Sequence, residues 1–147
     1  MEAASYTKLL PEPSPETEPY WAGLRAGKLM LQACAACGRV RHYPRPVCPH
    51  CYCLDAKWIE AKGRGKVHSW TITHHAFHPG WKGELPITLL TVDLDEGVRM
   101  QAQLSGPVAE AGVKIGMPVR IAYEAATKDL TLPVFVLDTE EQTVRAR

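Results

Sequence analysis

Two Cys-x-x-Cys pairs separated by ten residues constrain the fold of this chain more than any other feature. Each tight turn places two thiolates on one side of the chain, and two facing turns complete the tetrahedron that Zn²⁺ prefers, with Zn–S distances of about 2.3 Å. Four protein ligands leave no coordination position for substrate or water. We therefore predict one structural zinc ion, whose binding free energy also folds the segment around it. The predicted ligands are Cys34, Cys37, Cys48 and Cys51.

Other residues near the second pair leave the ligand set partly open. A fifth cysteine, Cys53, lies two residues beyond Cys51 and could replace it as a ligand. His42 and His50 could also serve, although solvated loop histidines are the simpler interpretation. A thioredoxin-like redox pair normally opens a helix after a strand, whereas turn and strand residues follow both pairs here.

The cysteines also bear on the cellular compartment. A disulfide framework would need an oxidising environment. The first residues of the chain contain no apolar segment of signal-peptide length, and no stretch is long enough to span a membrane. We therefore expect a cytoplasmic protein whose thiols are reduced.

Charge is unevenly distributed along the 147 residues. The whole chain carries 17 basic and 16 acidic residues, which argues against a uniformly basic nucleic-acid binder. Residues 34–82 hold eight Lys or Arg and two acidic residues, for +6, whereas residues 83–147 hold six basic and ten acidic residues, for −4. The central third is therefore electropositive, and either an anion-binding surface or a solvated loop face would produce this pattern.

The N-terminal part predicts an extended arm followed by one short helix. Prolines are frequent in residues 1–19, where they fix φ and remove hydrogen-bond donors, and such an arm could dock on a partner. Thr17 is a suitable capping residue and Gly27 can end a helix that spans residues 20–26. The apolar face of this helix either contacts a partner or packs on the ribbon of the same chain; its residues are Tyr20, Trp21 and Leu24.

Alternating and β-branched residues predict a mainly β fold. Strands at residues 28–34 and 57–60 flank the two cysteine turns, and five further short strands separated by Gly, Pro, Asp and Glu indicate a five-stranded OB-type Greek-key barrel. The predicted division is an arm at 1–19, a helix plus zinc ribbon at 20–62, an OB-fold domain at 63–140 and a tail at 141–147. The predicted barrel strands are Gly65–Thr73, Ile87–Asp93, Val98–Leu104, Val119–Tyr123 and Val134–Leu137.

A series of short motifs follows in an order typical of one protein family. The motifs are Tyr20-Trp21, Gly27-Lys28-Leu29, Cys34-x-x-Cys37-Gly38, Pro44-Arg45, Cys48-Pro49-x-Cys51, Trp58, Gly63-x-Gly65-x-Val67, Pro86, Leu94-x-Glu96-Gly97 and Gly116-Met117-Pro118-Val119. Between Tyr20 and about Leu137 the chain resembles the acyl-CoA-associated proteins that join a rubredoxin-like zinc ribbon to a C-terminal OB fold. The specificity lies in the combination of the aromatic helix, the cysteine turns and the Gly-x-Gly-x-Val segment, because many ribbons share the cysteine pairs alone.

This resemblance implies a role in acyl-CoA metabolism. Members of the family assemble with thiolase-superfamily enzymes, including thiolases, acyltransferases and the lipid-transfer-type aldolases that shorten steroid side chains as CoA thioesters. The implied role is a non-catalytic accessory subunit of a heteromer, in which the partner carries the nucleophilic chemistry. Cys53 departs from the family pattern and keeps the ligand set open.

The resemblance also suggests residues that could contact CoA. Phosphates call for Arg or Lys, and an adenine calls for an aromatic ring on which it can stack. For Trp58 and Trp70 we instead predict that both fill the junction between ribbon and barrel, and on this interpretation the basic side chains only solvate it. The candidate CoA-binding residues are Arg39, Arg41, Arg45, Arg64, Lys66 and Trp81.

The segment His74–His78 is the remaining candidate for chemistry. It contains three histidines and ends in Pro-Gly, with no acidic residue before Glu84, so we predict a ligand- or partner-binding loop rather than a catalytic metal, and no catalytic residue on this chain. The alternative function is a single-stranded nucleic-acid module, since ribbons and OB barrels both bind DNA or RNA. The near-neutral net charge and the presence of only two Phe weaken that alternative.

Overall fold

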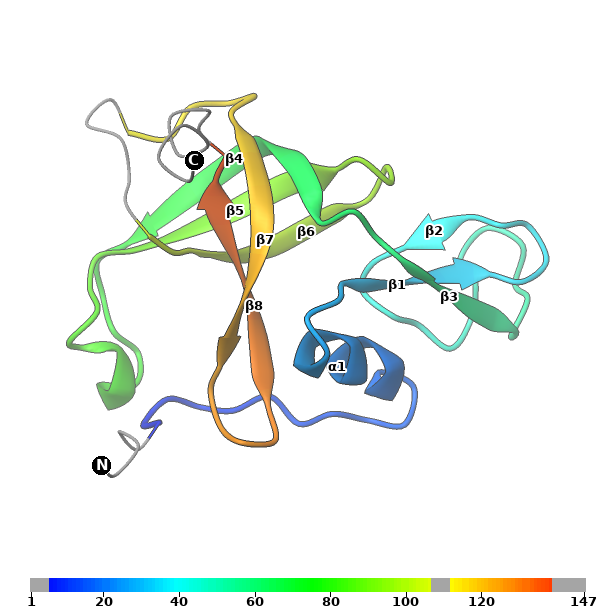
Figure 1. The fold of residues 1–147 in the computed structure, drawn as a ribbon, viewed down its shortest axis with the longest axis horizontal. Helices are drawn as coiled ribbons and strands as arrows, with labels where there is room; N and C mark the ends of the chain where they lie inside the picture. The colour runs from blue at the N-terminus through cyan, green and yellow to red at the C-terminus, as the bar shows by residue number, and fades with distance from the viewer. Residues whose placement is uncertain (1–5, 107–111, 139–147) are drawn as a thin grey trace, which may run out of the picture.

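In the computed structural model of the chain, residues 6–106 and 112–138 are described, and the predicted tail at 141–147 lies outside them. Within these residues the chain forms one α-helix, a three-stranded ribbon and a closed barrel, which confirms the predicted mainly β fold. Figure 1 shows the ribbon at one end of the molecule, the barrel at the other, and α1 below the segment that joins them.

Helix α1 (Glu18–Arg25) packs inside the molecule. Tyr20 is 6% exposed and Leu24 is 1% exposed, and both belong to the common hydrophobic core, so the partner-facing alternative for these two residues is wrong. Thr17 precedes the helix but its side chain does not cap it. Its Oγ1 instead accepts the N–H of Ser14 at 2.9 Å, because the preceding chain turns back on itself there.

The ribbon consists of β1 (Met30–Cys34), β2 (Val40–Arg41) and β3 (Ala56–Glu60), in the order β2-β1-β3 with antiparallel pairing. Cys34 ends β1, so the first cysteine turn grows directly out of the central strand. Gly38 follows this turn with φ of 72°, a conformation that glycine adopts without steric cost.

The barrel closes in the order β4-β5-β6-β8-β7. Only β6 and β8 pair in parallel, and the other four neighbouring pairs are antiparallel. Side chains of all five strands meet inside, where Leu90, Val92 and Phe135 are fully buried. The strands are β4 (Arg64–Thr73), β5 (Ile87–Leu94), β6 (Arg99–Leu104), β7 (Pro118–Ala125) and β8 (Thr131–Leu137).

Two glycines of the Gly-x-Gly-x-Val segment explain how the chain enters the barrel. Gly63 has φ of 69°, and a Cβ there would lie 2.5 Å from Cγ2 of Ile121. A Cβ on Gly65 would meet the backbone carbonyl of Asp93 and lie 2.7 Å from Cγ1 of Val92. Only hydrogen fits at Gly65, because β4 pairs there with β5 and β7 at once.

The two tryptophans assigned to the ribbon–barrel junction differ from each other. Trp58 of β3 is half-buried against the core. Trp70 of β4 is 38% exposed, so its predicted place at the junction is wrong. The reason is that β4 pairs with β7 only as far as Lys66, and a register shift between Val67 and Ser69 precedes its outer half, which pairs with β5 alone.

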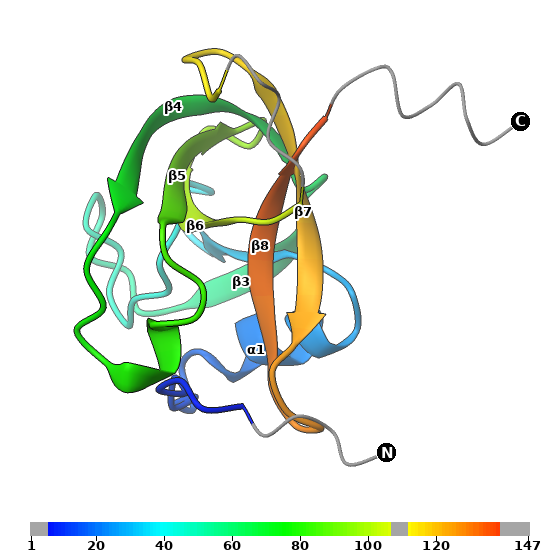
Figure 2. The same ribbon diagram turned by 90° about the vertical axis from the view of Figure 1, so that its left-hand side faces the viewer.

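The arm lies beside the loop that joins β4 to β5. This loop contains the short 3-10 helix η1 (Pro79–Trp81). Figures 1 and 2 both show the arm running from η1, past the lower ends of β7 and β8, to α1. The described residues of the arm therefore pack on their own chain. No helix among the described residues is long and apolar enough to cross a membrane.

Candidate functional site

Four thiols of the ribbon form a cluster of the size that a zinc ion requires. The Sγ atoms of Cys34 and Cys51 are 3.5 Å apart, those of Cys37 and Cys48 are 3.8 Å apart, and all four lie within 4.8 Å of one another. A regular tetrahedron with Zn–S distances of about 2.3 Å has S···S edges of about 3.8 Å. The donor set therefore fits one four-coordinate zinc.

Backbone groups prepare these thiols for metal binding. The first cysteine of each pair is buried and the second is exposed. The backbone N–H of Cys37 points at Sγ of Cys34 and lowers the pKa of that thiol, and the N–H of Cys51 lowers the pKa of Cys48 in the same way. Because the thiolate is the metal ligand, these hydrogen bonds favour the form that binds zinc.

The alternative ligands lie outside the cluster. The Sγ of Cys53 donates to the carbonyl of Asp55 at 3.7 Å, while its backbone carbonyl accepts the N–H of Cys48 at 3.0 Å and shapes the second turn. His42 packs between Tyr20 and Tyr43, and its ring is not part of the thiol group. Among the described residues the metal site is therefore a closed set of four thiolates, which gives it a structural role.

Three of the candidate CoA-binding residues lie on the ribbon. The guanidinium of Arg41 is buried, and it donates to Oε1 of Gln32 at 2.5 Å and to the carbonyl of Arg45 at 3.1 Å. Arg41 thus holds the loop after β2 against β1. Arg39 and Arg45 expose their side chains on the ribbon surface.

Two further candidates, Arg64 and Lys66, lie two residues apart on β4 and are exposed. Arg64 pairs in register with Arg120 of β7, which brings a second guanidinium to this face. Sequence reasoning missed Arg120, because the pairing of β4 with β7 joins segments more than fifty residues apart. The alternation of Val119, Arg120 and Ile121 was the available signal that Arg120 points outward.

The last candidate, Trp81, is half-buried in the loop between β4 and β5. It shares a cavity with Leu89, whose cross-strand partner is Thr71. Thr71 and Arg64 are seven residues apart on one strand, or about 23 Å. The six candidates therefore lie in three separate places: the ribbon, the first half of β4, and the loop around η1.

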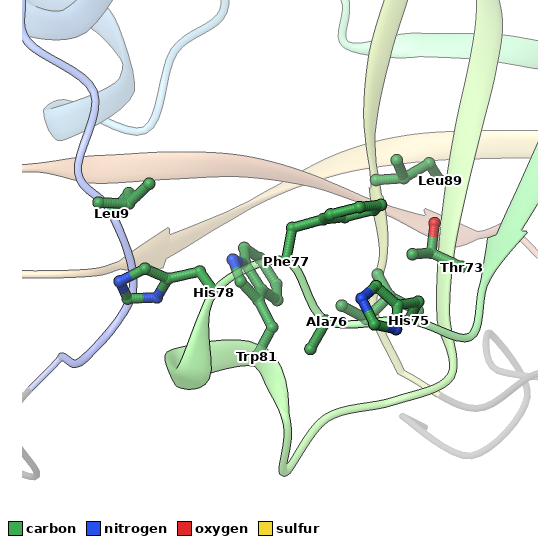
Figure 3. A pocket seen from close by; sticks show the side chains of 9 residues that line it. Leu9, Thr73, His75, Ala76, Phe77, His78, Trp81 and Leu89 are labelled. Carbon is green, nitrogen blue, oxygen red and sulfur yellow. The ribbon is translucent and has the colours of Figure 1, made fainter.

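An apolar cavity of about 360 Å³ lies beside Trp81. We call it the apolar pocket. Figure 3 shows Leu9 of the arm on one side, Leu89 and Thr73 on the other, and Phe77 and Trp81 between them. Its apolar lining comes from Leu9, Ala76, Phe77, Trp81, Ile87 and Leu89, and its polar lining from Thr73, His75 and His78.

A second cavity of about 370 Å³ adjoins the apolar pocket, since Trp81 and Leu89 line both. It is richer in polar groups. Gln101 and Gln103 of β6 face it, together with aromatic side chains from the arm, α1 and the ribbon loop. The arm lines both cavities, with Leu9 in the first and Lys8 in the second.

Two family models match successive parts of the chain. Residues 21–52 match the family described as ChsH2, rubredoxin-like zinc ribbon domain, and residues 58–124 match the family described as ChsH2, C-terminal OB-fold domain. In the solved structure of the Ltp2-ChsH2(DUF35) aldolase, one chain is 37% identical to this one with a TM-score of 0.79. The match covers 88% of this chain and 100% of that chain.

Three curated relatives are also similar. A probable enoyl-CoA hydratase alpha subunit of Thermomonospora curvata is 44% identical over 74% of this chain and 33% of the relative. The 3-oxo-4,17-pregnadiene-20-carboxyl-CoA hydratase alpha subunit of Mycobacterium tuberculosis is 36% identical over 77% and 35%. A DUF35 domain-containing scaffold protein of Pyrococcus furiosus is 30% identical over 69% and 74%. The chain thus spans about a third of the two hydratase subunits.

Proposed function

This chain belongs to the DUF35 family, in which a rubredoxin-like zinc ribbon precedes an OB-fold domain, and on that premise we propose that it is a non-catalytic accessory subunit of a thiolase-superfamily enzyme. The observation that carries the proposal is the match to the full length of a chain in the Ltp2-ChsH2(DUF35) aldolase, at 37% identity and a TM-score of 0.79. The closed thiolate site supports it, because a four-coordinate zinc stabilises a fold without offering a position for substrate.

The proposed substrates of the complex are acyl-CoA thioesters. The names of two relatives specify hydratase subunits that act on CoA thioesters, one of them a pregnadiene-carboxyl derivative. We propose that the partner is a thiolase, an acyltransferase or a lipid-transfer-type aldolase, with retro-aldol cleavage of a steroid side chain as one such reaction. The proposed location is the cytoplasm, where thiols stay reduced and can hold zinc.

Direct contact with CoA is a further part of this proposal. Arg64 and Lys66, with Arg120 opposite, present three cationic side chains on one face of the barrel, which suits the phosphates of CoA. Arg39 and Arg45 of the ribbon would act as a separate, weaker contact. Arg41 is excluded from this role because its guanidinium already binds Gln32 and the carbonyl of Arg45.

Co-expression with thiolase-like genes tests the accessory role. The zinc-loaded chain should co-elute with one such partner in gel filtration at a fixed stoichiometry, and the partner's turnover of its CoA thioester should need the chain. If none of the thiolase-like candidates forms a complex with the chain, the proposal is refuted. Salt-dependent binding of a labelled single-stranded oligonucleotide at micromolar protein would support the nucleic-acid alternative instead.

A further inference from the structure

We infer that the apolar pocket beside Trp81 binds the acyl group of the CoA thioester on which the partner enzyme acts. The inference rests on the function proposed above and extends it by giving this chain a part in holding the substrate. Three segments that are distant in sequence build the pocket: the arm, the loop around η1, and the paired strands β4 and β5.

Specific contacts hold the walls of the pocket in place. The Lys8 ammonium pairs with Glu84 at 2.6 Å and lies 4.4 Å from the centre of the Trp81 ring. A Cβ on Gly80 would lie 2.5 Å from the carbonyl oxygen of Thr7, so the arm and the loop touch through their backbones. These contacts fix Leu9, next to Lys8, as a wall opposite β5.

The lining of the pocket selects a hydrocarbon. Leu9 is 73% exposed, Phe77 is 92% exposed and Leu89 is 44% exposed, so large apolar surfaces face water here. An apolar ligand would remove such surface from water, which stabilises the complex by about 25 cal/mol per Å². Of the polar side chains, His78 already accepts the N–H of Gly80 through Nδ1 at 3.1 Å. The pocket therefore offers few groups to a nucleotide or sugar.

The volume of the pocket is large enough for an acyl group. About 360 Å³ falls within the usual range of small-molecule sites, which is about 300 to 1,000 Å³. A protein cavity of about 150 Å³ holds one benzene molecule. The apolar pocket thus has more than twice the space that a phenyl ring needs, as a medium-length acyl chain or a fused-ring group would require.

The neighbouring cavity suits the polar remainder of a thioester. Trp81 and Leu89 line it as well, and its side chains include Gln101 and Gln103, whose amides can both donate and accept hydrogen bonds. Lys8 also faces it. An amphipathic ligand with an apolar end beside Phe77 would place its amide and thioester groups toward these residues.

Titration calorimetry on the zinc-loaded full chain tests the inference. The probes are dodecanoate, dodecanoyl-CoA and CoA. Dodecanoate and dodecanoyl-CoA should bind, and CoA should not displace dodecanoate. Leu9→Ser and Leu89→Ser should each weaken dodecanoate binding about fivefold or more, because each removes an apolar wall. Leu54→Ser is the matched control, since Leu54 is 71% exposed on the ribbon side of the molecule and should leave binding unchanged.

Three results would overturn the inference. The first is the absence of dodecanoate binding, and the second is equal binding of dodecanoate by Leu89→Ser and the unmodified chain. The third is a Phe77→Ser chain that binds dodecanoate normally but no longer captures the thiolase-like partner, because the face would then be a protein interface. If the chain captures the partner but binds no dodecanoate, the inference about the pocket is refuted and the accessory role is not. Dodecanoate binding without any partner would refute the accessory role and support acyl binding by the pocket.

Discussion

The ammonium of Lys8 lies 4.4 Å from the centre of the Trp81 ring, so one residue of the proline-rich arm contacts the aromatic residue that lines both cavities. The same ammonium pairs with Glu84 at 2.6 Å, and the Lys8 side chain is only 16% exposed. The Lys8 cation therefore joins the arm to the loop through two contacts, beside the backbone approach of Thr7 to Gly80.

Replacing Lys8 should loosen that unit. Lys8→Met keeps the aliphatic stem but removes both the ion pair and the cation–π contact, at an expected cost of about 1 kcal/mol in unfolding free energy. The arm should also be cleaved faster by a protease that cuts near residues 6–13. Urea unfolding and limited proteolysis measure the two effects.

The matched control is Lys28→Met. Lys28 pairs with Glu60 at 3.2 Å, but both side chains are more than half exposed, so the change should stay below about 0.5 kcal/mol. Equal effects of the two substitutions would show that the arm is not held by Lys8.

The zinc content of cysteine variants distinguishes the four predicted ligands from the fifth cysteine, Cys53. The unmodified chain should bind one zinc, and Cys48→Ser should lose it and unfold the ribbon, because a structural metal supplies folding free energy. Cys53→Ser should retain the metal, since the Cys53 thiol contacts the carbonyl of Asp55 instead. Elemental analysis of gel-filtered protein gives the answer, and loss of zinc from Cys53→Ser would contradict the ligand assignment.

Local patterns were enough to predict the ribbon and the barrel. The cysteine spacing predicted the four thiols that the structure groups together, although it left Cys53 open as a ligand. The five barrel strands lie within three residues of their predicted bounds because turn-forming Gly, Pro and Asp residues delimit them. The family resemblance supplied the connection to thiolase-like enzymes, which the matches to the ChsH2 domains and the aldolase chain support.

What sequence reasoning missed depends on contacts between distant segments. No local pattern indicates that Lys8 reaches Trp81, that Arg120 lies opposite Arg64, or that Arg41 is buried against Gln32. Each of these follows from strand register or from the path of the arm, and both are set by the whole fold. The apolar pocket could not be predicted for the same reason, since its walls come from three segments.

Gly65 should be intolerant of even one methyl group. In Gly65→Ala the new Cβ would meet the backbone carbonyl of Asp93, which strand pairing holds in place. The expected loss of unfolding free energy is about 2 kcal/mol, as for other overpacked positions. Gly83→Ala is the control, because nothing lies within 4 Å of a Cβ there. Urea unfolding of both variants measures the difference, and equal stability would mean that β4 can shift away from β5.

His42 should make the stability of the protein depend on pH. Its ring lies 3.9 Å from that of Tyr43 and 5.5 Å from that of Tyr20, measured between ring centres. Neither ring nitrogen has a hydrogen-bond partner among the described residues. Burial lowers the pKa of His42 from 6.5 to about 4, because the charged imidazolium is disfavoured away from water.

The sign of the effect follows from that direction. Between pH 6.5 and about 4 the unfolded chain binds a proton at His42 that the folded chain does not bind. The contribution of neutral His42 is therefore complete above pH 6.5 and is lost as the pH falls toward 4. Its full size is about 3 kcal/mol, since each tenfold change in an acid dissociation constant corresponds to about 1.4 kcal/mol.

His42→Phe isolates this contribution, because the replacement keeps an aromatic ring between Tyr20 and Tyr43 and cannot bind a proton. Unfolding free energies at pH 7, 6 and 5 should fall less steeply for His42→Phe than for the unmodified chain. Release of zinc at acid pH affects both proteins alike and cancels in the difference between them. His74→Phe, which removes an exposed histidine, should keep the original slope. Identical slopes for the unmodified chain and His42→Phe would show that His42 takes up its proton in the folded state.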